Sequence, residues 1–124
     1  SVNNKDIHVD KLHMAVDCGV PVNPDIIKAQ MQGGAGYSLG AIMRNEVTLD
    51  QGEVVQSNFP DYEPIRMADM PEIDIHIIAS ADAPTGVGEP GVPPTAPAVA
   101  NAIFAKTGVR ITNLPIRKHG FSFV

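Results

Sequence analysis

The alternation of hydrophobic and polar residues predicts several short strands along the chain. Every second residue from Leu12 to Cys18 is apolar, a period typical of a half-buried strand. The same period recurs from Ile73 to Ile77 and predicts a second strand. Alternation on both sides of a turn predicts a hairpin over residues 46–56, and residues 109–111 are expected to form a short last strand.

Two stretches repeat their apolar residues every three or four positions, which predicts helices. The first begins at Pro24, with Asn23 as its cap, and is about 20 residues long. Its expected apolar face consists of Ile26, Ile27, Met31, Gly34, Tyr37 and Ala41. The second is capped by Thr95 and ends at Gly108. Its expected apolar face consists of Ala96, Val99, Ala100, Ile103 and Phe104. This order of elements favours an α+β two-layer sandwich, with the two main helices on one face of a mixed sheet.

The first predicted helix has four glycines in its middle: Gly33, Gly34, Gly36 and Gly40. Each glycine costs a helix about 1 kcal/mol relative to alanine. So many glycines therefore predict that another backbone or a ligand lies close to this helix.

Composition and charge limit the class of protein. The 124 residues are 44% hydrophobic and 19% charged, which fits one globular domain over residues 1–124. The net charge of -5 argues against nucleic acid as a partner, and no apolar run approaches the roughly 18 residues of a membrane span. Cys18 is the one cysteine, so a disulfide or a cysteine zinc site within the chain is excluded, and its place in the strand predicts a buried thiol. Because the chain starts at Ser1 without methionine, we expect a fragment or a mature product.

A loop rich in proline and glycine, residues 84–94, contains one ionisable side chain, Glu89. Pro90 favours extended backbone at Glu89, and the nearby glycines allow a ligand to approach the main chain closely. Beside Val87 and Val92 this carboxylate is expected to be poorly hydrated, which would make it a better general base near neutral pH. The same loop is also compatible with an ordinary solvated glutamate.

Three segments resemble the xanthine oxidase family of molybdenum hydroxylases, in the family's order along the chain. Residues 85–90, followed by an apolar helix that ends at residues 100–103, resemble the catalytic glutamate loop. Residues 16–24 and 30–34 resemble the cofactor-binding strand and helix, and residues 108–115 resemble the C-terminal end. Residues 86–94 and 56–59 are most similar to the isoquinoline 1-oxidoreductase beta-subunit branch, which includes aldehyde oxidoreductases.

This resemblance implies a C-terminal part of a molybdopterin-binding large subunit that does no chemistry alone. It implies molybdopterin cytosine dinucleotide with molybdenum as cofactor, and iron–sulfur clusters in a partner small subunit. The implied reaction oxidises an aromatic N-heterocycle such as isoquinoline, or an aldehyde, with water as the oxygen source, in the bacterial cytoplasm or periplasm. Glu89 matches the catalytic base and Gln30 the glutamine that hydrogen-bonds the pterin. The matching cofactor-lining residues are Thr85, Gly86, Val87 and Gly88. The family's mammalian members have lysine and alanine where this chain has Thr85 and Gly86, so a basic side chain is absent from the loop.

Other functions have weaker signals. Residues 36–40 fit the G-x-S-x-G motif of serine hydrolases, with Ser38 as nucleophile and Asp82 and His119 downstream, but the serine falls inside a predicted helix. Residues 86–91 fit G-x-G-x-x-G, but the prolines that follow prevent a helix from starting there. The four histidines lack the spacing of a metal site. A non-catalytic α+β interaction module is the alternative from a different class.

Overall fold

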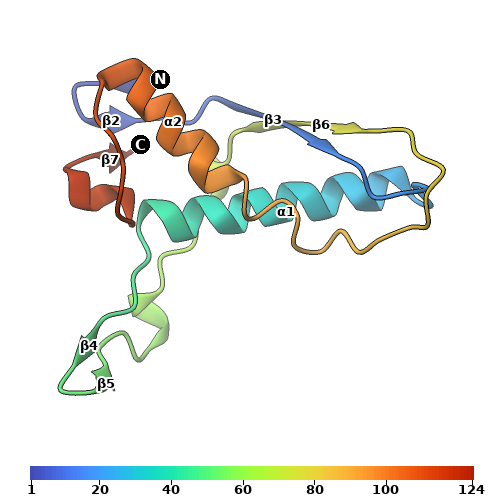
Figure 1. Ribbon diagram of the computed structural model, residues 1–124. Coiled ribbons are helices and arrows are strands. Elements are labelled where there is room, and N and C mark those ends of the chain that lie inside the picture. Colours follow the sequence, from blue (N-terminus) through green and yellow to red (C-terminus); the bar gives the residue numbers. More distant parts are fainter.

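A central helix and several small β-sheets organise the computed structural model, which covers residues 1–124 (Figure 1). The two main helices are α1 (Pro24–Met43) and α2 (Thr95–Thr107). The strands are β1 (Val2–Asn3), β2 (Asp6–Ile7), β3 (Lys11–Val16), β4 (Leu49–Asp50), β5 (Glu53–Val54), β6 (Glu72–Ile77) and β7 (Ser122–Phe123). Three short 3-10 helices are η1 (Phe59–Asp61), η2 (Met67–Asp69) and η3 (Ile116–His119). The predicted α+β class is confirmed.

The strands form three separate sheets instead of one mixed sheet. β3 and β6 pair in parallel, with Met14 opposite Ile75. β1, β2 and β7 form a second sheet, and β4 pairs with β5 in the predicted hairpin. β3–β6 lies along one side of α1, and the segment between β6 and α2 runs along the opposite side (Figure 1). Only β3 and β6 exceed two residues, so the other pairs are too short to extend into a common sheet.

Helix α1 begins as the sequence predicts, because the Asn23 side chain accepts a hydrogen bond from the Ile26 N–H and Pro24 occupies the first turn. Its buried face is displaced from the predicted one. Ile27 is buried as expected, but Ile26 is 56% exposed and Tyr37 is 63% exposed. Met31, Ala35, Leu39, Ile42 and Met43 are also buried. The buried residues therefore lie on a neighbouring face of α1, which contacts β6 and α2.

The start of α2 differs from the prediction that Thr95 caps it. Pro94 is the cap, and Thr95 is the first helical residue. Its hydroxyl donates to the carbonyl of Gly91, four residues earlier, as threonine can do from within a helix. Gly108 ends the helix as predicted, with a φ of 74.

The last strand predicted at residues 109–111 is wrong. Arg110 instead packs over the Phe104 ring at 3.5 Å and donates to Asn101, which turns this segment back onto α2. The last strand is β7, which pairs in parallel with β2. This pairing depends on contacts across the whole chain.

Helix α1 takes part in both hydrophobic clusters. The larger one joins α1, α2 and the C-terminal segment. It contains Ile7, Leu39, Ile42, Met43, Val99, Ile103, Ile116 and Phe121. The smaller one contains Val16, Cys18, Ile27 and Met31, with Val87 packed against it. The predicted burial of the Cys18 thiol is confirmed, since this residue is 4% exposed.

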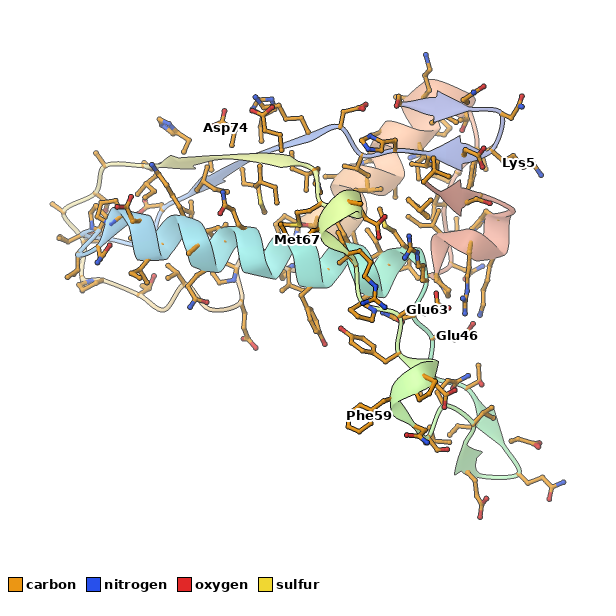
Figure 2. The ribbon with its side chains drawn as sticks, turned by 180° about the vertical axis from the view of Figure 1, so that it is seen from behind. Lys5, Glu46, Phe59, Glu63, Met67 and Asp74 are labelled. Atoms are coloured by element: carbon orange, nitrogen blue, oxygen red, sulfur yellow. The ribbon has the colours of Figure 1, made fainter.

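Residues 45–62, which we call the arm, extend away from the helices (Figure 2). The arm consists of the β4–β5 hairpin and η1. Phe59, labelled in Figure 2, is 93% exposed. No helix in the structure is both long enough and apolar enough to cross a bilayer.

Candidate functional site

The segment that joins β6 to α2, residues 78–94, carries the predicted site. Its first part is held to the residues that follow β3. The Val20 N–H donates to the Asp82 carbonyl at 3.0 Å, and the Thr85 N–H donates to the Cys18 carbonyl at 2.9 Å. Gly19, with a φ of +73, allows this approach, because a Cβ there would lie 2.3 Å from the Ala83 carbonyl oxygen. These two hydrogen bonds fix the part of the segment that precedes Glu89 in the sequence, up to Thr85.

The second part of the segment rests directly on the backbone of α1. A Cβ on Gly91 would lie 2.6 Å from the Met31 carbonyl oxygen, and a Cβ on Gly34 would lie 3.2 Å from the Gly91 Cα. The prediction that the glycines of α1 admit another backbone is confirmed at Gly34. It is also confirmed at Gly40, which faces Ile65, whereas Gly33 faces open space.

Glu89 opens a four-residue turn. The Val92 N–H donates to the Glu89 carbonyl at 2.9 Å, with Pro90 at the second position that proline favours in such turns. The Glu89 side chain makes no hydrogen bond or ion pair within the chain and is exposed. The expectation that it is poorly hydrated is therefore wrong for this chain by itself. Its turn borders a depression of about 500 Å³. The lining residues are Gly86, Gly88, Glu89, Pro90 and Pro93.

The residues just before the glutamate present unused hydrogen-bond donors. The four consecutive N–H groups from Gly86 to Glu89 donate to nothing within the chain. A Cβ on Gly86 or Gly88 would meet nothing within 4 Å, so their backbone borders open space. The Thr85 hydroxyl is likewise exposed and without a partner. Because backbone donors require partners, this strip can bind an oxygen-rich group in place of water.

Gln30 lies on the same side of α1 as this strip. It is one turn before Gly34, which contacts Gly91, and three residues after Ile27. Ile27 shares a groove with Pro84, Thr85 and Val87. The Gln30 side chain is exposed and forms no hydrogen bond within the chain. The fold therefore brings the predicted pterin-binding residue and the predicted base loop to one face of the helix.

Gln32 provides a contrast two residues further along α1. Its amide donates to the Ile73 carbonyl at 3.4 Å, so it faces β6. The two glutamines point to different sides of the helix. Only Gln30 is available to a ligand beside the loop.

The serine hydrolase alternative is wrong. Ser38 is 2% exposed inside α1 and has no histidine partner. His119 instead contacts the carbonyl of Asn113 at 3.0 Å. Residues 86–91 do not open a helix, because α2 begins only at Thr95. No group of three or more histidine, cysteine, aspartate or glutamate residues is placed to hold a metal ion.

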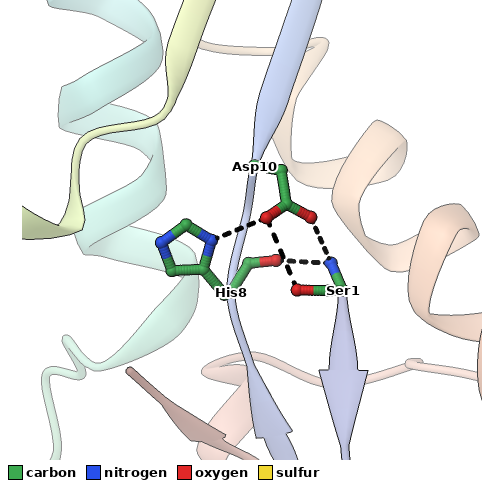
Figure 3. Close-up of polar contacts among 3 residues, drawn as sticks. All are labelled: Ser1, His8 and Asp10. Carbon is green, nitrogen blue, oxygen red and sulfur yellow. Dashed lines mark hydrogen bonds and ion pairs between the residues drawn. The ribbon is translucent and has the colours of Figure 1, made fainter.

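A separate polar cluster joins Ser1, His8 and Asp10 (Figure 3). The Ser1 ammonium donates to Asp10 at 2.7 Å, and a His8 ring nitrogen lies 3.0 Å from the same carboxylate. The hydrogen bond from the ammonium is the main reason that the pKa of Asp10 falls from 3.8 to about 2. Nearby, a hydrogen bond to Glu72 raises the pKa of Lys11. These exposed contacts hold the first strands together and are not part of the loop site.

Comparisons with known proteins identify the family of the chain. The family described as "Molybdopterin cofactor-binding domain" matches residues 2–71. The membrane-bound, pyrroloquinoline-quinone aldehyde dehydrogenase of Gluconacetobacter polyoxogenes is 39% identical over 120 residues, and isoquinoline 1-oxidoreductase subunit beta of Brevundimonas diminuta is 36% identical over 111 residues. Each alignment covers 90% of this chain, but only 16% and 14% of those relatives.

A solved structure has the same fold. Quinoline 2-oxidoreductase from Pseudomonas putida 86 superimposes with a TM-score of 0.77 and is 28% identical. The match covers 88% of this chain and 15% of that one. The matched region of these proteins is thus a small part of a much longer chain.

Proposed function

This chain belongs to the molybdopterin cofactor-binding domain family, and we propose that it forms one wall of the active site of a molybdenum hydroxylase. Glu89 is the catalytic base in this proposal. The observation that supports it is the contact of the loop with α1, where Gly91 rests on Gly34, one helical turn after Gln30. The remaining walls belong to other parts of the complete protein.

The residues around the loop fit a molybdenum–pterin cofactor. Such a group offers ring-carbonyl, phosphate and metal-ligand oxygens, which can accept hydrogen bonds from backbone N–H groups that approach closely. The free N–H groups of Gly86, Val87 and Gly88 supply the donors, and the open space at both glycines permits the approach. Gln30 would hold the pterin through its free amide, and Thr85 to Gly88 would face the metal's ligands. We further propose the cytosine dinucleotide form of the cofactor and iron–sulfur clusters in a partner subunit.

The bound cofactor would accept the two electrons removed from the substrate. The chain's own contribution is a proton acceptor at the Glu89 carboxylate oxygens. Glu89 takes a proton from the water-derived nucleophile, which raises the reactivity of the oxygen that enters the product. The turn that begins at Glu89 fixes the backbone of this residue, and no other ionisable residue lies between Pro84 and Pro94 to compete with its carboxylate.

The proposed substrate is an aromatic N-heterocycle or an aldehyde. The support is that two relatives are named for isoquinoline and for aldehyde oxidation. An electron-poor carbon beside a ring nitrogen and an aldehyde carbon accept the same oxygen nucleophile, so one base serves both. The family match and the pterin-compatible loop favour this reading over an interaction module without catalysis.

The test is metal analysis of the complete protein together with turnover in ¹⁸O-labelled water. We expect bound molybdenum and labelled oxygen in the product. One relative's name assigns pyrroloquinoline quinone to that protein, so the same sample is examined for quinone. Quinone without molybdenum, or product oxygen derived from dioxygen, would refute the proposal.

A further inference from the structure

We propose that Thr95 is a positioning residue for Glu89. Its hydroxyl fixes the carbonyl of Gly91 and thereby holds the turn that carries the carboxylate. This inference rests on the proposed role of Glu89 as the base. It adds a residue at the start of α2, outside the strip of N–H groups from Gly86 to Glu89.

The hydrogen bond from Thr95 is short and shielded from water. Thr95 Oγ1 donates to the Gly91 carbonyl at 2.8 Å, and Thr95 is 2% exposed. Gly91 is buried as well. A buried carbonyl that loses its donor keeps the full cost of its desolvation, so this contact constrains the backbone strongly.

Gly91 is held from two sides. One side rests on α1, where a Cβ would lie 2.6 Å from the Met31 carbonyl oxygen, and the other is bonded to Thr95. The Val92 N–H then closes the turn on the Glu89 carbonyl. These three contacts fall within the four residues that begin with the glutamate.

The opposite side of Glu89 is held by packing and not by hydrogen bonds, because Val87 packs against the cluster of Val16, Cys18, Ile27 and Met31. The N–H groups from Gly86 to Glu89 form no hydrogen bond within the chain, and the nearest upstream bond is that of the Thr85 N–H. Hydrogen bonds therefore restrain Glu89 from one side, through the end of the turn at Gly91 and Val92, where Thr95 binds the Gly91 carbonyl. Movement of Gly91 would be passed to Glu89 over two residues.

A purely structural role is the competing explanation, because threonine often bonds the carbonyl four residues earlier. The chain offers a matched control at the other end of the same helix. Thr107 Oγ1 donates to the Ile103 carbonyl at 2.7 Å, remote in sequence from the loop. Thr107→Val removes the same kind of bond, together with the hydrogen bond that Thr107 Oγ1 accepts from the Val109 N–H at 3.1 Å, and leaves the Glu89 turn intact.

The experiment compares Thr95→Val, Thr95→Ser and Thr107→Val in the complete, molybdenum-loaded protein. Thr95→Val should lower kcat about 10-fold, since a displacement of about 1 Å at a reacting group can cost up to about 10²-fold. Molybdenum content and KM should change little. Thr95→Ser keeps the hydroxyl and should restore most of kcat, whereas Thr107→Val should leave kcat unchanged. If serine and valine at position 95 reduce kcat equally, packing explains the effect and the proposal is overturned.

A double-mutant cycle with Glu89→Gln separates this inference from the proposed function. If Thr95 acts through Glu89, Thr95→Val should cause no further loss of kcat in the Glu89→Gln background. An equal loss in both backgrounds would overturn the positioning role. Near-normal turnover of Glu89→Gln alone would instead refute the base assignment on which the inference rests.

Discussion

Alanine substitution at two adjacent glycines of α1 tests the contact between the loop and the helix. A Cβ on Gly33 meets nothing within 4 Å. A Cβ on Gly34 would lie 3.2 Å from the Gly91 Cα, 3.3 Å from the Gly91 carbonyl carbon and 3.4 Å from the Val92 nitrogen. All three atoms belong to the backbone, so no flexible side chain can move aside.

The expected magnitudes follow from two opposing terms. Alanine stabilises a helix interior by about 1 kcal/mol relative to glycine, and this gain applies at both positions. At Gly34 it is offset by overpacking against the loop, which typically costs about 1–3 kcal/mol. We therefore expect Gly33→Ala to raise the free energy of unfolding by about 1 kcal/mol. Gly34→Ala should be about 1–3 kcal/mol less stable than Gly33→Ala.

The assay is urea unfolding followed by circular dichroism for the wild type and both variants. The two variants share the same chemical change in the same helix, so differences in intrinsic helix propensity cancel. Equal stabilisation by both alanines would refute the seating of Gly91 on α1, and with it the structural basis for the position of Glu89.

A further prediction concerns the cofactor. Gln30→Ala should lower the molybdenum content of the purified protein, because the free amide of Gln30 is the proposed pterin contact. Gln32→Ala is the control and should retain the metal, since the Gln32 amide faces Ile73. Equal molybdenum content in the two variants would contradict the assignment.

Local sequence signals predicted the elements whose ends are set by nearby residues. The cap at Asn23 and the stop at Gly108 act within one helical turn, so the start of α1 and the end of α2 follow from sequence. The buried face of α1 did not, because the loop, the sheet and α2 compete for it. Ile26 and Tyr37 satisfy the helical period, yet neither is covered.

Pairings between distant segments were not predictable. The parallel register of β3 and β6 and the late pairing of β7 with β2 depend on tertiary packing. The segment at residues 109–111 has strand-forming residues, but Arg110 lies over Phe104 and Ile111 packs against the larger hydrophobic cluster. Residues with β propensity thus became a connection instead of a strand.

In the site, too, local features were predictable from the sequence and tertiary contacts were not. The motifs indicated the family. The family match and the 36% identical isoquinoline 1-oxidoreductase subunit confirm it. The sequence also placed a rigid loop around Glu89. It misjudged the hydration of the carboxylate, because Val87 packs inward on the cluster of Val16 and Cys18 and leaves Glu89 uncovered. Thr95 was predicted as a cap, and only the structure revealed its bond to Gly91.

The turnover of Glu89→Gln in the complete protein tests the central claim most directly. Glu53→Gln, which removes an equally exposed carboxylate on the arm, is the matched control. We predict that Glu89→Gln retains its molybdenum and loses about 10²-fold or more in kcat, the usual effect of losing a general base, while Glu53→Gln behaves as the wild type. A Glu89→Gln protein that keeps both its metal and near-normal kcat would contradict the account.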